Sequence, residues 1–149
     1  MIRVQREDFD TGMELARLGA GRTDIGGLVS FVGVVRGAED GVKAMTLEHY
    51  PGMTEKALTG IAEEAKQRWP GIELAIIHRF GHLRTGERIV FVGVAAAHRA
   101  AAFAACEFLV DWLKTRAPFW KLEERQDGAH WVEAQREDDA RAERWEKVR

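Results

Sequence analysis

The sequence predicts a single α+β domain in which helices pack against a mixed, largely antiparallel sheet. Strand-like and helix-like segments are interspersed without a regular βαβ repeat, and turn signals between neighbouring strand-like segments predict hairpins. The chain has 149 residues, of which 46% are hydrophobic, and no linker-like stretch divides it. We therefore expect residues 1–149 to form one domain, with a charged helical tail at 137–149.

The N-terminal third predicts three strands and one short helix. Residues 2–6 alternate as a short strand does, and Asp8 or Asp10 can cap a helix carrying Met13, Leu15 and Leu18. Residues 26–35 are apolar and rich in valine, which is typical of a strand buried on both faces. Residues 42–50 predict a further strand.

The middle of the chain predicts a helix followed by a hairpin. Pro51 and Thr54 can start the helix, which Pro70 and Gly71 end. One face of this helix is apolar and carries Leu58, Ile61, Ala65 and Trp69. Residues 72–80 and 88–96 are strand-like, and Thr85 with Gly86 supplies a turn between them. We expect these two strands to pair.

The C-terminal third predicts a long helix, a second hairpin and the tail. Residues 98–116 are alanine-rich and apolar on most of their circumference, and Pro118 stops the helix. A helix this apolar must be covered on more than one side. Residues 119–125 and 130–134 can pair around Asp127 and Gly128, and the tail that follows is expected to be solvated, with Trp145 as its anchor.

Composition excludes several classes of function. A net charge of -2, from 22 basic and 24 acidic residues, provides no overall field that would gather nucleic acid or anionic lipid. The single cysteine, Cys106, excludes an intramolecular disulfide and a multi-cysteine metal site. No apolar run approaches a signal core or a membrane span, so we expect a cytoplasmic protein.

Local cations offer the first candidate site. His98 and Arg99 follow a buried strand and open a helix, where free backbone N–H groups favour an anion. Arg36, at the end of the 26–35 strand, is placed to act as an anion clamp. Each feature has a plain alternative, because His98 can serve only as a cap and both arginines can be ordinary surface charges.

A second candidate is the segment 113–121, which places three cations beside two aromatic rings. Lys114 lies within about 120° of Arg99, Glu107 and Asp111 on the helix. These charged residues can simply form a solvent-exposed face of the helix, with Lys114 complementing the helix C-terminus. Alternatively, Lys114 or Lys121 can act as an acid, a base or a stabiliser of negative charge. The residues alone leave both interpretations open.

Helix geometry connects the two candidates. Arg99 and Lys114 are about 22 Å apart along one helix at about 1.5 Å per residue, so one chain cannot easily place both in one small pocket. A symmetric dimer could bring His98 and Arg99 of one subunit towards Lys114 and Lys121 of the other.

Other signals are weaker. His78 and His82 have the spacing of helical metal pairs but lie in a strand-to-turn pattern with no third ligand evident. Cys106 lies among apolar helix residues and is better explained as core than as a nucleophile.

Several long motifs resemble the large subunit of molybdopterin synthase. The matching segments are FVGVVR at 31–36, LEHYPGMTEK at 47–56, IHR at 77–79, GERIVFVGV at 86–94, HR at 98–99 and LKTRAPFWK at 113–121. They occur in the family's order and span most of the chain. The resemblance implies an α/β-hammerhead fold and a homodimer that binds a small ubiquitin-like subunit at each end, giving a heterotetramer.

The resemblance also implies the reaction and the residues that perform it. The Gly-Gly thiocarboxylate tail of the small subunit would enter the active site and transfer sulfur to cyclic pyranopterin monophosphate, forming the dithiolene of molybdopterin without a metal or cofactor on this subunit. Lys114 would lie nearest the thiocarboxylate, and Lys121 would be a second catalytic lysine that acts on the pterin. Arg36, His98 and Arg99 would bind the substrate phosphate, the last two from across the dimer.

Two regions depart from the family pattern. Leu122 and Glu123 follow Lys121 where the family often has another basic residue, and Gln135 stands where an arginine is common. We leave both regions out of the predicted site. The rival interpretation is a non-catalytic scaffold dimer whose cations bind a phosphorylated ligand or a partner's tail without reaction.

Overall fold

The computed structural model describes residues 1–37, 41–132 and 136–146, and the side chains of 136 and 137 are not among the described parts. Eight strands form two four-stranded sheets. The first sheet contains, in order, β1 (Ile2–Gln5), β4 (Glu73–Arg79), β6 (Arg88–Ala96) and β2 (Gly27–Val34). The second contains β5 (Gly81–Arg84), β3 (Val42–His49), β7 (Phe119–Arg125) and β8 (Gly128–Trp131).

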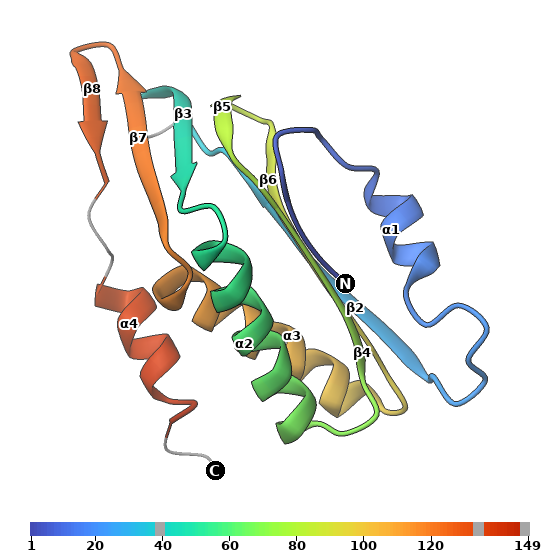
Figure 1. The fold of residues 1–149 in the computed structure, drawn as a ribbon. Helices are drawn as coiled ribbons and strands as arrows, with labels where there is room; N and C mark the ends of the chain where they lie inside the picture. The colour runs from blue at the N-terminus through green and yellow to red at the C-terminus, as the bar shows by residue number, and fades with distance from the viewer. Residues whose placement is uncertain (38–40, 133–135, 147–149) are drawn as a thin grey trace.

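Four helices accompany these sheets: α1 (Thr11–Arg17), α2 (Met53–Arg68), α3 (Arg99–Arg116) and α4 (Arg136–Glu143). Figure 1 shows α2 and α3 on one face of the first sheet and α1 on the opposite face. Only the β1–β4 pair is parallel among the described pairings. The α+β prediction and the mixed, largely antiparallel pairing are therefore confirmed.

The segment predicted to be a simple turn between two paired strands is partly a strand. The hairpin itself is confirmed, because β4 pairs antiparallel with β6. Between these two strands, however, the chain leaves the first sheet and forms β5, which pairs with β3 in the second sheet. Gly81 has a φ of 97°, a backbone conformation that glycine adopts without strain. This bend carries the chain from one sheet to the other, which the hydrophobic pattern alone did not indicate.

The prediction that residues 26–35 form a strand buried on both faces was wrong for the single chain. β2 is an edge strand whose described pairing is with β6 alone. Leu28, Phe31 and Val34 are 44%, 37% and 47% exposed. The apolar composition is real, but in the described part of the chain no further strand pairs along this edge. Such an exposed apolar edge is typical of an interface.

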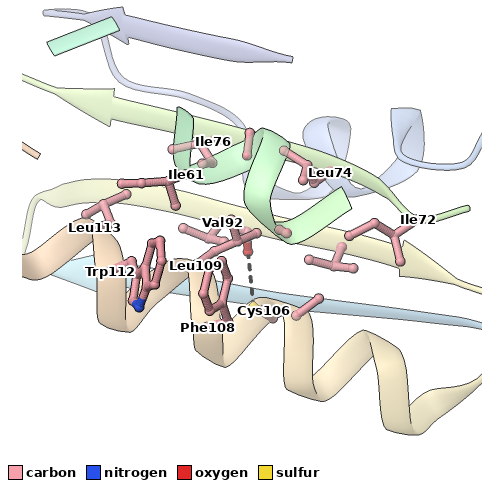
Figure 2. Close-up of a cluster of buried hydrophobic side chains, with 14 of the residues drawn as sticks. Ile61, Ile72, Leu74, Ile76, Val92, Cys106, Phe108, Leu109, Trp112 and Leu113 are labelled. Atoms are coloured by element: carbon pink, nitrogen blue, oxygen red, sulfur yellow. Dashed lines mark hydrogen bonds between the residues drawn. The ribbon is translucent and has the colours of Figure 1, made fainter. Parts of the chain in front are cut away.

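The main core lies between the first sheet and the helices α2 and α3. Figure 2 shows α3 side chains such as Phe108 and Leu109 packed against Ile76 and Val92 of the sheet. The predicted apolar face of α2 is confirmed by burial of Leu58, Ile61 and Ala65. Each fully buried large apolar side chain contributes roughly 1.5–3 kcal/mol. This core fixes the direction of α3 and therefore the position of its last turn.

The opposite face of the first sheet packs against α1. Asp10 caps this helix by accepting a hydrogen bond from the Met13 amide at 2.9 Å, so one of the two predicted caps is confirmed. Phe9 and Leu18 pack there against Phe91 in a smaller cluster. No helix in the described part of the chain is long and apolar enough to cross a bilayer.

The C-terminal segment packs on α3, whereas a solvated tail was expected. Trp145 is the predicted anchor, and its ring lies 5.6 Å from that of Phe108. Asp111, which is only 5% exposed, accepts hydrogen bonds from Arg141 at 3.1 Å, Arg144 at 3.1 Å and the Trp145 indole at 2.8 Å. Asp111 on α3 therefore holds the C-terminal segment against this helix. The last predicted tail residues, 147–149, lie outside the described residues.

This docking gives a stability prediction. Asp111→Ala should lower the free energy of unfolding by about 2 kcal/mol, because the half-buried Trp145 indole and two arginines lose the same buried acceptor. Glu107→Ala is the matched control, since Glu107 binds the same two arginines but is 45% exposed, and it should cost less than about 1 kcal/mol. Urea denaturation measures both, and equal losses would contradict the role of Asp111.

Candidate active site

A cavity of about 240 Å³ lies where the last turn of α3 meets the ends of β2, β4 and β7. Its described polar lining side chains are His78, Lys114 and Lys121. The remaining lining residues are mostly apolar: Phe31, Val32, Gly33, Val34, Ile89, Val90, Val92, Val110, Leu113, Ala117 and Phe119. Two cations in a mostly apolar cavity can bind and stabilise a small anionic group.

The turn after α3 brings the two lysines together. The helix ends at Arg116 with Ala117 as its C-cap, and Pro118 prevents its continuation. The Thr54 hydroxyl donates a hydrogen bond to the Pro118 carbonyl at 3.2 Å and fixes the turn against the start of α2. β7 then runs back beside β3, with Lys121 opposite Leu47. Lys114 and Lys121 therefore reach one cavity from two different elements.

The two lysines differ in their surroundings. Lys114 is exposed and Lys121 is half-buried. Burial lowers the pKa of Lys121, and the charge of Lys114 lowers it further, while Asp138 and Glu123 act in the opposite direction. A lysine with a lowered pKa exchanges protons more readily near neutral pH. Lys121 is therefore suited to move a proton, and Lys114 is suited to meet an incoming anion.

His78 lines the cavity but was not among the predicted site residues. In the sequence it was notable for its spacing from His82 and as part of the family-like segment 77–79. The two histidines lie on different sheets, and His82 is exposed beside Glu124 at 3.3 Å. His78 is 4% exposed and stacks on Phe119, with ring centroids 3.7 Å apart. A histidine directly after the apolar run 74–77 was the available signal, because a buried histidine needs a polar partner.

His98 and Arg99 lie at the other end of α3 from the cavity. His98 occupies the N-cap position, but its side chain makes no capping hydrogen bond, so a role as cap alone does not explain it. Arg99 lies against Gly27 at the beginning of β2, whereas Lys114 lines the cavity with Val34 at the end of β2. Within one chain, His98 and Arg99 are thus separated from Lys114, as the length of the helix predicted.

Arg36 also lies outside the cavity. It lines a separate open depression with Glu123, Arg125, Asp127, His130, Trp131 and Val132. The structure of one chain therefore brings Lys114 and Lys121 together but does not bring Arg36, His98 or Arg99 to them. Gln135, the second departure from the family pattern, lies outside the described residues.

Two other candidates have structural explanations. Arg116, the third cation of segment 113–121, lies 3.9 Å over the Trp112 ring and forms an ion pair with Glu146. Cys106 is buried in the main core, and burial raises the pKa of its thiol to about 11. A thiol so protonated is a poor nucleophile, so the prediction that Cys106 is a core residue is confirmed.

Comparisons with known proteins agree with this geometry. A family model described as MoaE protein matches residues 4–116. The chain is 59% identical over 148 residues to the molybdopterin synthase catalytic subunit of Pseudomonas aeruginosa, covering 98% of this chain and 99% of that protein.

Solved structures are also similar. The molybdopterin biosynthesis MoaE protein from Burkholderia ambifaria has a TM-score of 0.85 and 55% identity, with 98% of this chain and 97% of that chain covered. In Helicobacter pylori, a chain from the complex of subunits 1 and 2 of molybdopterin-converting factor has a TM-score of 0.74 at 20% identity, covering 90% and 91%. The last comparison supports the fold alone.

Proposed function

Because the chain belongs to the MoaE protein family, we propose that its cavity performs sulfur transfer to a phosphorylated pterin. The chain is an enzyme of molybdopterin biosynthesis and acts as the catalytic subunit of molybdopterin synthase. Its substrates in this proposal are cyclic pyranopterin monophosphate and the C-terminal thiocarboxylate of a small ubiquitin-like subunit. The product carries the dithiolene of molybdopterin.

The observation that carries the proposal is the convergence of Lys114 and Lys121 in one largely apolar cavity. Attack by sulfur and loss of the carboxylate both move negative charge, and positioned cations stabilise that charge more strongly away from water. Lys114, the more exposed of the two, meets the thiocarboxylate. Lys121, with its lowered pKa, acts on the pterin intermediate.

A two-fold dimer along the β2 edge would complete the site. In an isologous contact the same surface meets itself in opposite directions. The beginning of β2, beside Arg99, would then face the end of the partner's β2, beside Lys114. His98 and Arg99 would supply the phosphate site from across the dimer, and Arg36 would join them from the depression beside β7. The cavity of about 240 Å³ is smaller than the roughly 300–1,000 Å³ of ordinary ligand sites, which supports a shared site.

The apolar surface on this side has the composition of an interface. Phe103 of α3 is 63% exposed and lines a groove with Phe31 of β2. The groove has a volume of about 440 Å³ and also contains Lys114, so it continues from the cavity. Burial of such side chains is the main favourable term in association.

Dimer formation can be tested at this surface. Phe103→Glu should convert the protein to a monomer at micromolar concentration, because a charge would be buried at the interface without a partner. Met13→Glu is the matched control, since Met13 is 50% exposed on α1, on the opposite face of the sheet. Sedimentation velocity measures the oligomeric state. A dimeric Phe103→Glu variant would contradict the proposed interface.

The small subunit would bind where its tail can enter the cavity. A Gly-Gly tail has no side chains beyond Cα, so it can enter a cavity of about 240 Å³, and its anionic end complements Lys114. The related H. pylori protein is solved as a complex of two subunits. We propose the same assembly here, with one small subunit at each end of the dimer to give a heterotetramer. A cytoplasmic location and the absence of a metal or cofactor stay predictions.

The direct test of function is reconstitution. The purified chain is incubated with a thiocarboxylated small subunit and cyclic pyranopterin monophosphate, and mass spectrometry follows the gain of two sulfur atoms. Product formation supports the proposed reaction. Binding of both substrates without product would favour the non-catalytic scaffold instead.

A further inference from the structure

His78 lines the cavity, and its hydrogen bond defines one tautomer of the ring. Alternation along β4 places it on the same face as Leu74 and Ile76, under α2 and α3. Its Nδ1 lies 2.8 Å from the Arg79 carbonyl oxygen. A carbonyl can only accept, so Nδ1 carries the proton and donates. In a neutral ring, Nε2 is then a bare acceptor.

The ring stays neutral at physiological pH. Burial lowers the pKa of His78 to about 3, although the hydrogen bond to Arg79 raises it, and the charges of Lys121, Lys114 and His49 lower it further. These three residues come from β7, α3 and β3. Such a histidine is a poor general acid and a weak general base near neutral pH. Its useful property is the fixed acceptor at Nε2.

Two lysines line the cavity together with that acceptor. His78, Lys114 and Lys121 are the polar side chains that line the cavity in the described part of the chain. Lys121 is the more buried lysine, and its charge affects His78 more than that of Lys114 does. An ammonium has three donors, and a half-buried one needs acceptors that water no longer supplies. Phe119, stacked on the imidazole, prevents the ring from turning away.

We propose that His78 is a positioning residue for Lys121, whose ammonium it holds by accepting a hydrogen bond at Nε2. This proposal rests on the function proposed above, because it assigns Lys121 a role in the reaction. The hydrogen bond directs the remaining donors of the ammonium towards the bound pterin. The hydrogen bond also favours the charged form of Lys121, whereas burial disfavours that form. His78 itself exchanges no proton with substrate.

Two matched substitutions separate this role from packing. His78→Asn keeps a donor near Nδ1 for the Arg79 carbonyl but has no group at the Nε2 position. His78→Gln can place its amide oxygen near Nε2. Both remove the aromatic stack on Phe119. We expect kcat to fall about tenfold in His78→Asn, with KM for the pterin within about twofold, and to recover largely in His78→Gln. Equal kcat values in the two variants would overturn the proposal.

A titration of the free protein gives a readout that does not depend on activity. With 15N-labelled lysine, the Lys121 pKa should be about one unit lower in His78→Asn than in His78→Gln, since an acceptor stabilises the ammonium. Lys66 on α2 is the reference, because it is exposed and paired with Glu63. A Lys121 pKa that is the same in both variants would count against the hydrogen bond, whatever the assay shows.

The unsubstituted ring provides a measurement that holds even if both variants fail to fold. Histidine 15N spectra should show a proton on Nδ1 and none on Nε2 from pH 5 to pH 8. The Nε2 signal should move more in Lys121→Ala than in Lys114→Ala. A proton on Nε2, or equal movement, would disprove the inference. Full activity of Lys121→Ala would instead disprove the proposed function, so the two failures are distinguishable.

Discussion

Lys114→Ala should lose on the order of 100- to 1000-fold in conversion of the pterin when the thiocarboxylated small subunit is supplied. Lys114 is the exposed cation of the cavity, placed to meet the incoming anionic sulfur. Removing one group that stabilises developing negative charge typically costs this much in kcat. The change should leave folding intact, because substitutions at exposed positions usually alter stability by less than about 0.5 kcal/mol.

Lys66→Ala is the matched control for this loss. Lys66 is also a helical lysine and is 47% exposed, but it lies on α2 and pairs with Glu63. It should retain the activity of the unsubstituted chain. Mass spectrometry of product over time measures both variants, with thermal unfolding as the check on folding. Unchanged turnover in Lys114→Ala would remove the catalytic assignment of the cavity.

Mixing Arg99→Ala and Lys114→Ala chains should restore activity that neither variant has alone. If the site is shared, a mixed dimer contains one site with both lesions and one with neither. Random exchange makes about half of the dimers mixed, so about a quarter of all sites become intact. The assay is best performed at low pterin concentration, because Arg99→Ala is expected chiefly to weaken substrate binding.

The control mixture combines Lys114→Ala with Lys121→Ala. Both lysines line the same cavity of one chain, so every site in a mixed dimer carries one lesion and no activity should return. Activity in the Arg99 mixture that only equals the mean of the separate variants would contradict the shared site. Recovery in the control mixture would contradict the grouping of the two lysines.

Local sequence signals predicted most of the elements. The Asp10 cap, the apolar face of α2 and the stop at Pro118 all depend on residues within a few positions of each other. The same holds for Cys106, whose apolar neighbours on α3 predicted its burial. Two misjudged segments, β2 and the C-terminal residues around Trp145, depend on partners far away in the sequence. Hydrophobic content indicates that a surface is to be covered, but it does not identify what covers it.

The candidate site shows the same division. The sequence by itself determined which cations are available, and helix length indicated that Arg99 and Lys114 cannot easily share one small pocket in a single chain. Only the tertiary structure decided that Lys114 and Lys121 meet in one cavity, that Arg36 lies apart from it, and that His78 lines it. The physical reason is that pattern and propensity are local, whereas a cavity forms where distant strands and helices pack. Its burial, charges and hydrogen-bond partners exist only after that packing.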